Sequence, residues 1–161
     1  SIANELKAQL PEGYEGKFLE ISQLPLFDQD YEAEGATPES YVHFRKEVEA
    51  CDAFIFATPE YNRSFPAAIK NALDVASRPY GHSKWSGKPA AVVSVSPGAI
   101  GGFGANHHLR QVLTFLNVHP VQQPEAYIGS VMNLLDESGR VKNEDTRALL
   151  KSVVSALIAK I

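Results

Sequence analysis

The sequence has a single cysteine, no long apolar run and no cluster of basic residues, and each shortage removes a class of protein. Cys51 is the only cysteine among 161 residues, so neither an internal disulfide nor a thiolate metal cluster can form. Such cysteine usage is typical of a reducing compartment, and we expect a cytoplasmic protein. No apolar stretch approaches the roughly 20 residues of a membrane span. The residues from Ser1 onward have the character of a helix rather than of a signal peptide.

Charge and composition narrow the range of partners. The formal net charge is −4 and no run of lysine and arginine exists, so the chain offers no general attraction to a phosphate backbone. We therefore expect no nucleic-acid partner and no membrane insertion. Hydrophobic residues make up 44% of the chain, which is enough to fill the core of a single domain spanning residues 1–161.

Apolar runs alternate with amphipathic stretches along the chain, a pattern typical of βα units on a parallel sheet. We predict strands at residues 17–21, 52–57, 90–95 and 118–122, and helices at 1–10, 37–50, from Pro66 onward, around 109–116 and after Asn143. Thr37, which precedes Pro38, is expected to cap the second of these helices, and Asn143 is expected to cap the last one. The pattern as a whole predicts an α/β fold.

Two unusual loops follow the two most apolar predicted strands. The first contains Pro59, Glu60, Tyr61 and Asn62, and the second, Ser96–Gly102, contains three glycines. The carboxyl ends of parallel strands lie at one edge of a sheet, and ligands bind outside that edge. Glycine lets a backbone approach a flat molecule without a Cβ atom in the way. The two loops therefore indicate a site for a planar heterocycle with several hydrogen-bonding edges.

Four segments carry a resemblance to a known family: "TPEYNRSFPAAIKNALD" from Thr58, "SPGAIGG" from Ser96, and then "HHLRQVL" and "QPEAYIG". Together they resemble the NAD(P)H-dependent FMN reductase family of flavodoxin-like proteins, which includes quinone and chromate reductases. The resemblance implies a three-layer α/β flavodoxin-like fold whose parallel sheet has the strand order 2-1-3-4-5. It implies FMN as cofactor, NADPH or NADH as electron donor, and ping-pong transfer of hydride through FMN to quinones, chromate or similar acceptors. Because the cofactor performs the redox step, neither a catalytic side chain nor a metal is expected.

The resemblance also assigns individual residues. The cofactor-binding set that it implies is Pro59, Glu60, Tyr61, Asn62, Ser96, Gly98, Gly101 and Gly102. Tyr80, His82 and Trp85 would wall the substrate side of the flavin and touch a partner subunit, because relatives are commonly homodimers or homotetramers. Two alternatives stay open. Gly101 and Gly102 would instead allow close helix packing, and residues 78–87 would form an ordinary loop.

The sequence departs from the family at its start. Relatives begin with a strand and a G-S-x-R-x-x-S-x-N type loop, which wraps the FMN phosphate at the N-terminus of a helix. Neither feature is present here. We therefore expect the central strand of the sheet and the phosphate loop to lie upstream of Ser1, outside these residues.

Two other functions remain alternatives to the flavin reductase. A flavodoxin-like electron carrier would bind FMN without oxidising NAD(P)H, and a flavin-free scaffold would keep only the fold. Ser96 does not fit a hydrolase nucleophile, because Ser94 stands where the nucleophile elbow requires glycine. His107 and His108 are adjacent, so they point apart on a helix and do not indicate a zinc site. Cys51 is expected to be a small core residue.

Overall fold

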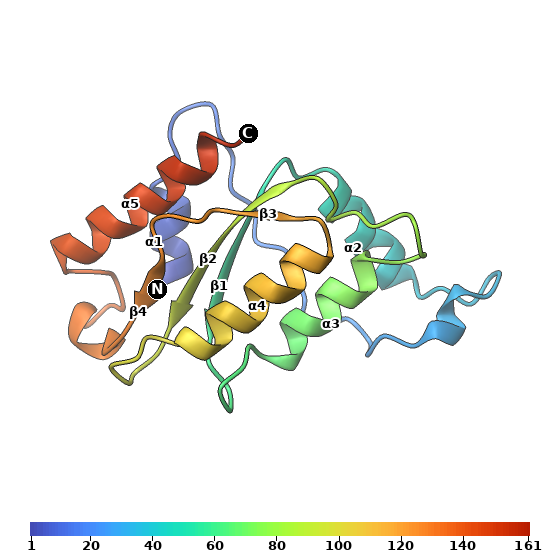
Figure 1. Cartoon of the computed structure of the whole chain (residues 1–161), viewed down its shortest axis with the longest axis horizontal. Helices are drawn as coiled ribbons and strands as arrows, with labels where there is room; N and C mark the ends of the chain where they lie inside the picture. The colour runs from blue at the N-terminus through green and yellow to red at the C-terminus, as the bar shows by residue number, and fades with distance from the viewer.

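A parallel sheet separates two layers of helices in the computed structural model, which describes residues 1–161 (Figure 1). Its strands are β1 (Phe54–Pro59), β2 (Pro89–Val95), β3 (His119–Pro120) and β4 (Ala126–Ile128). The helices are α1 (Ile2–Ala8), α2 (Glu39–Glu49), α3 (Ala67–Ala76), α4 (Phe103–Phe115) and α5 (Glu144–Ile158), with short 3-10 helices η1 (Gln29–Glu32) and η2 (Val131–Leu134). Helices α1 and α5 cover one face of the sheet, and α2, α3 and α4 cover the other. The predicted three-layer α/β architecture is confirmed.

Strand β2 is the centre of the sheet. Strand β1 runs parallel along one edge of β2, and Pro59 lies beside Val95 where both strands end. The other edge of β2 pairs with β3 near its start and with β4 near its end. The strand predicted at 118–122 is therefore reduced to His119–Pro120, and pairing resumes in β4, which the sequence did not predict. The order β1, β2 and then β3 with β4 matches the last three positions of the expected 2-1-3-4-5 order.

The strand predicted at residues 17–21 is wrong. These residues pair with no strand, although Leu19 and Ile21 pack against the core beside α2 and α3. Apolar alternation specifies which side chains turn inward, whereas a strand also requires a neighbour to exchange hydrogen bonds with. Strand β1 likewise pairs only with β2.

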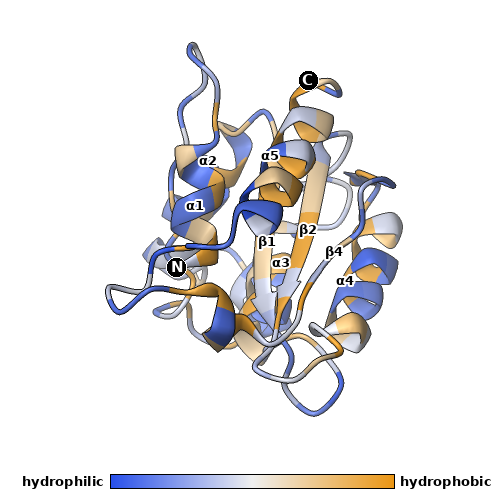
Figure 2. Cartoon of the chain, turned by 90° about the vertical axis from the view of Figure 1, so that its left-hand side faces the viewer, coloured by the Kyte–Doolittle hydropathy of each residue, from blue (hydrophilic) through white to orange (hydrophobic).

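The two apolar strands divide their side chains between two cores. Phe54 and Val92 pack against α2, α3 and α4, while Ala91 and Val93 face α1 and α5. This is the alternation expected of strands covered on both faces, and Figure 2 shows β1 and β2 as largely apolar ribbons. None of the helices is both long and apolar enough to cross a membrane.

The predicted cap of α5 is confirmed, whereas the predicted cap of α2 is wrong. The Asn143 side chain accepts a hydrogen bond from the Thr146 amide at 2.8 Å. Helix α2 has Pro38 at its N-cap position and no side-chain cap. The Thr37 hydroxyl instead donates to the Tyr31 carbonyl at 2.7 Å. Thr37 therefore fastens the loop that contains η1, and α2 depends on its packing.

The turn before α5 gives a prediction about acid stability. Asp136 accepts hydrogen bonds from the Ser138 hydroxyl at 2.6 Å and from the amides of Ser138 and Arg140 at 2.9 Å each. These donors, chiefly the Ser138 hydroxyl, lower the pKa of Asp136 from 3.8 to about 2. Because folding lowers this pKa, the ionised carboxylate stabilises the fold above its unfolded pKa, and the contribution is lost as the pH falls toward 2.

Asp136→Asn is therefore expected to make the melting temperature less sensitive to pH between about 4 and 2, because the variant has no carboxylate to protonate at this turn. Thermal unfolding followed by circular dichroism across this range checks the difference. Glu137→Gln, which changes an exposed neighbour with no hydrogen bond of its own, is the matched control. Parallel melting curves for the wild type and Asp136→Asn would contradict the assignment.

Candidate functional site

The two loops singled out in the sequence lie side by side. Because Pro59 and Val95 are paired at the ends of β1 and β2, the segments that follow begin next to each other at the carboxyl edge of the sheet. They also meet further out, where the Ala105 amide of α4 donates to the Glu60 carboxylate at 3.0 Å. The expectation that the two loops form one surface is met by this geometry.

The loop after β1 is a tight hairpin. The Tyr61 and Ser64 backbones exchange hydrogen bonds of 2.8 and 3.0 Å, and between them Asn62 and Arg63 have φ values of 51° and 68°. Two successive left-handed residues are the mark of a type I′ turn. Arginine in this conformation costs about 1–2 kcal/mol, so the surrounding contacts must hold the turn in place. Tyr61 is 62% exposed at its tip.

The glycines of the second loop have different roles. Gly101 and Gly102 have φ values of 66° and 74°. A Cβ atom on Gly101 would lie 2.6 Å from the Tyr127 carbonyl carbon, and one on Gly102 would lie 3.0 Å from the Ser94 Cβ. Close packing and backbone conformation therefore require both glycines, although the packing is against β4 and β2 and not, as the alternative expected, against a helix. At Gly98 an added Cβ would meet only the Ser96 Oγ, at 3.5 Å, so no protein group explains the missing side chain there.

Main-chain donors surround Gly98. The Gly98 amide donates to the Ser96 hydroxyl at 3.0 Å, and the Gly101 amide faces the Gly98 carbonyl at 3.4 Å. The amides of Ala99 and Ile100 donate to no protein acceptor, and both residues are exposed. An open turn with free amide donors and no side chain at its bend suits the flat, acceptor-rich ring of FMN, so the residues present fit this cofactor.

A third segment, which follows β4, completes the edge. The Ser130 and Val131 amides donate to the Gly98 and Ser96 carbonyls at 3.0 and 3.2 Å. A Cβ on Gly129 would lie only 2.3 Å from the Ala99 carbonyl oxygen. Sequence reasoning assigned this segment no role, although its motif "QPEAYIG" ends at Gly129 and was the available signal.

An aromatic cluster lies beside the glycine loop. Phe103 and His107 on α4 have ring centroids 4.2 Å apart, and Phe103 lies 5.2 Å from the Tyr127 ring of β4. The His107 Nε2 and Tyr127 hydroxyl are 2.8 Å apart. Burial, together with the nearby Glu125 carboxylate, raises the pKa of Tyr127. The cluster packs α4 against Tyr127 of β4, the strand against which Gly101 packs. It therefore stabilises the glycine loop indirectly, through that strand.

The three residues expected on the substrate side do not join this edge. Tyr80, His82 and Trp85 lie in the connection from α3 to the start of β2, and the amino ends of the strands are at the opposite edge of the sheet. Tyr80 and His82 are exposed there. Trp85 is 2% exposed, belongs to the core and donates its ring N–H to the Leu73 carbonyl at 3.0 Å. The substrate-side assignment of Trp85 is therefore wrong.

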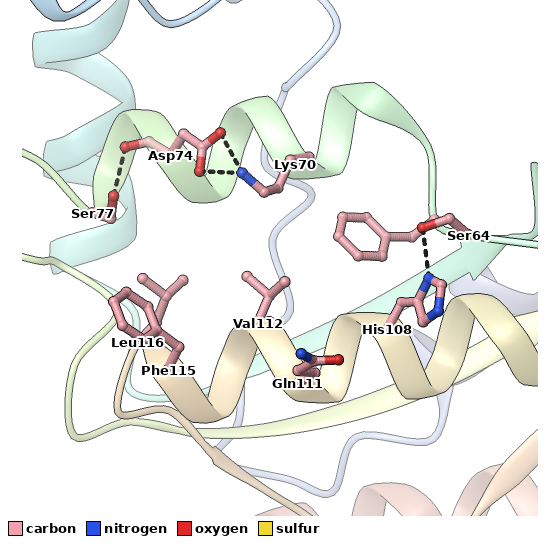
Figure 3. Close-up of a pocket in the computed structure, with 10 residues that line it drawn as sticks. Ser64, Lys70, Asp74, Ser77, His108, Gln111, Val112, Phe115 and Leu116 are labelled. Atoms are coloured by element: carbon pink, nitrogen blue, oxygen red, sulfur yellow. Dashed lines mark hydrogen bonds and ion pairs between the residues drawn. The ribbon is translucent and has the colours of Figure 1, made fainter.

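A groove of about 580 Å³ lies between α3 and α4 (Figure 3). Ser64 and His108, 3.1 Å apart, mark the end of the groove nearest the hairpin, and Ser77 and Phe115 mark the other end. No residue of the Ser96–Gly102 loop lines it. The groove is thus a neighbour of the two-loop surface and not part of it.

Comparison with known proteins agrees with this arrangement. The family profile described as NADPH-dependent FMN reductase matches residues 1–133. A quinone reductase of Pseudomonas putida is 54% identical over 153 residues, which cover 95% of this chain and 81% of that protein. A 2-hydroxy-1,4-benzoquinone reductase of a Burkholderia species is 40% identical over 158 residues, covering 98% and 85% of the two chains.

A solved structure extends the agreement to three dimensions. FerB from Paracoccus denitrificans, described as a flavoenzyme NAD(P)H:(acceptor) oxidoreductase, has a TM-score of 0.87 and 38% identity, and the match covers 98% of this chain and 86% of that one. The fold and the paired loops define a flavodoxin-like flavoprotein. The chain belongs to the NADPH-dependent FMN reductase family.

Proposed function

We propose that this protein is an NAD(P)H-dependent FMN oxidoreductase that reduces quinones and similar small acceptors. The single observation that carries the proposal is the pairing of two open loops at the carboxyl edge, where the bend at Gly98 is bare and the neighbouring amides are free. The family and the names of its quinone-reducing relatives support the same activity. The redox chemistry is supplied by FMN when it is bound, which takes hydride from NAD(P)H and returns electrons to the acceptor.

The chain's own residues bind and orient the ring. We place Pro59, Tyr61, Asn62, Ser96 and Gly98 at its edge, because these residues form the rim of the two loops, where all but the half-buried Ser96 are exposed. The free amides near Gly98 would favour negative charge on the reduced ring, since preorganised donors stabilise charge where it develops. Gly101 and Gly102 shape the turn, and Glu60 points toward α4. No acid or base of the protein is assigned to the reacting atoms.

Mixing the FMN-loaded protein with NADPH in the absence of air tests the function. Rapid loss of the visible flavin absorbance is expected, followed by its return when a quinone is added. An electron carrier of flavodoxin type would stay yellow, and that result would overturn the proposal.

Because donor and acceptor use the same ring in turn, steady-state double-reciprocal lines at several quinone concentrations are expected to run parallel. Intersecting lines would contradict the ping-pong order. Chromate is proposed as a further acceptor, and the same assay tests it.

We also propose that the working form is a homodimer or homotetramer that uses the groove between α3 and α4. Phe115 is 87% exposed at one end of this groove, and apolar side chains of Phe65, Val112 and Leu116 line it. A projecting ring and a partly apolar hollow lie on the same face, so a two-fold axis would allow the ring of each chain to bury itself in the hollow of the other. The single free Cys51 supports placing this assembly in the reducing cytoplasm.

Phe115→Glu is expected to convert the assembly to smaller species, because a charge would replace the ring at the contact. Light scattering coupled to gel filtration gives the masses. Leu26→Glu, which changes a residue 78% exposed and absent from the groove lining, is the control and should keep the wild-type mass. A wild-type mass of one chain at micromolar concentration would reject the proposed assembly.

A further inference from the structure

The carboxylate of Glu60 does not point away from the protein toward a ligand. Its side chain is only 12% exposed, and one oxygen accepts the Ala105 amide at 3.0 Å. The other oxygen lies 3.4 Å from the Arg63 guanidinium. The resemblance assigned Glu60 to the flavin, yet both oxygens already have protein partners.

Ala105 belongs to the first turn of α4, where backbone amides have no partner inside the helix. The N-cap residue of this helix is Gly102, which has no side chain to accept them. A carboxylate near a helix N-terminus is also favoured by the helix dipole. Glu60, which comes from a different loop, therefore supplies the cap that the helix lacks.

The same turn of α4 presses closely on the hairpin. A Cβ atom on Gly104 would lie 2.7 Å from the Arg63 carbonyl oxygen and 3.1 Å from the Glu60 carboxylate. Arg63 is one of the two hairpin residues held in the left-handed conformation, at a φ of 68°. Packing against α4 therefore holds the strained turn in place, and the hydrogen bond from the Ala105 amide to Glu60 strengthens this attachment.

The next residue of α4 holds the other loop. Asn106 is fully buried, and its amide nitrogen lies 3.3 Å from the Ser94 hydroxyl. That hydroxyl donates to the Gly101 carbonyl at 2.7 Å. Two consecutive helix residues therefore connect the loops: Ala105 binds the hairpin through Glu60, and Asn106 binds the glycine loop through Ser94.

We propose that Glu60 is a positioning residue, which fixes the hairpin at a set distance from the glycine loop by capping α4. The proposal rests on the proposed function, because the gap that it sets is the gap for FMN. Glu60 acts on the cofactor through the hairpin and not by touching it. The side chain needs an oxygen acceptor for this role, whereas its charge is secondary.

Glu60→Gln and Glu60→Ala separate this role from direct contact. Glutamine keeps an oxygen for the Ala105 amide, so FMN affinity is expected to stay within about threefold of wild type, while alanine is expected to weaken it about tenfold. FMN dissociation constants come from quenching of flavin fluorescence. Hydrogen exchange of the Ala105 amide in protein free of FMN reads the cap itself. It should stay slow with glutamine and become fast with alanine.

Three outcomes decide the matter. Equal loss of affinity in both variants, with the Ala105 amide protected in both, would overturn the proposal and return Glu60 to the flavin. Unchanged affinity in Glu60→Ala would overturn it as well. Failure of the wild type to bind FMN would instead reject the proposed function, while the hydrogen-exchange comparison would still report whether Glu60 caps α4. Glu137→Ala, at an exposed turn, is the control for removal of a glutamate and should leave every readout unchanged.

Discussion

Asn106→Ala is expected to lower the free energy of unfolding by about 3 kcal/mol, because it removes the side chain that serves several buried polar groups at once. Asn106 is fully buried. Its amide nitrogen faces the Val92 and Ala126 carbonyls at 3.4 and 3.3 Å, and its oxygen accepts from the Arg110 guanidinium at 2.7 Å. Alanine would remove all of these hydrogen bonds at once from a fully buried position.

The size of this effect follows from the break in the sheet. The edge of β2 pairs with β3 at Pro89 and Ala90 and with β4 from Val93 onward, so Ala91 and Val92 have no register partner on this edge. Asn106 fills that interval from the helix, and Arg110 donates to the Val121 carbonyl at 2.7 Å from the same side. A side-chain network thus replaces the missing length of strand.

Urea unfolding measures the loss, and Asn133→Ala, at an exposed position, is the control, with a change expected within about 0.5 kcal/mol. A loss below about 1 kcal/mol for Asn106→Ala would show that the network contributes little. Asn106 is also connected to Gly101 by hydrogen bonds through the Ser94 hydroxyl. The variant should therefore bind FMN more weakly even at temperatures where it remains folded.

The sequence correctly predicts those elements whose own side-chain pattern is enough to determine the secondary structure. The runs at 52–57 and 90–95 are apolar except for Asp52 and Ser94, so burial on both faces follows from their composition. The predictions fail where a strand forms only if another segment lies alongside to pair with it. Residues 17–21 have strand-like alternation but no neighbour to pair with, and the run at 118–122 pairs for only two residues before β4 takes up the pairing with β2. No local pattern in the sequence indicates where one short strand stops and the next begins.

The candidate site shows the same division between what the sequence predicts and what it does not. That two loops meet at one edge follows from parallel topology, and their sequences indicate it. The direction in which a side chain points within these loops cannot be predicted in this way. The sequence motif indicates Glu60 as a cofactor ligand, whereas in the structure its carboxylate caps α4. The sequence does not predict this contact, because the partner Ala105 is distant along the chain. Trp85 reads as a surface aromatic among turn residues, yet it fills the core beside Phe54, with ring centroids 4.8 Å apart.

Gly101→Ala and Gly98→Ala are expected to separate folding from cofactor binding within one loop. At Gly101 the added methyl group would meet the Tyr127 backbone at 2.6 Å, and a φ of 66° is unfavourable for alanine. Backbone atoms cannot move aside as a flexible side chain does, so a loss of about 3 kcal/mol in the free energy of unfolding is expected. The Tyr127 strand and the loop would shift apart, and FMN binding should fall with stability.

At Gly98 the same methyl group has open space on the protein side, with only the Ser96 hydroxyl near it at 3.5 Å. Stability is therefore expected to change by less than about 1 kcal/mol. If the flavin ring lies against this bend, the methyl group separates the ring from the free amides, and FMN affinity should drop about tenfold. Thermal unfolding of the protein without FMN and titration with FMN measure the two quantities independently. Unchanged FMN affinity in Gly98→Ala would move the ring away from this loop, and wild-type stability in Gly101→Ala would contradict the close packing against β4.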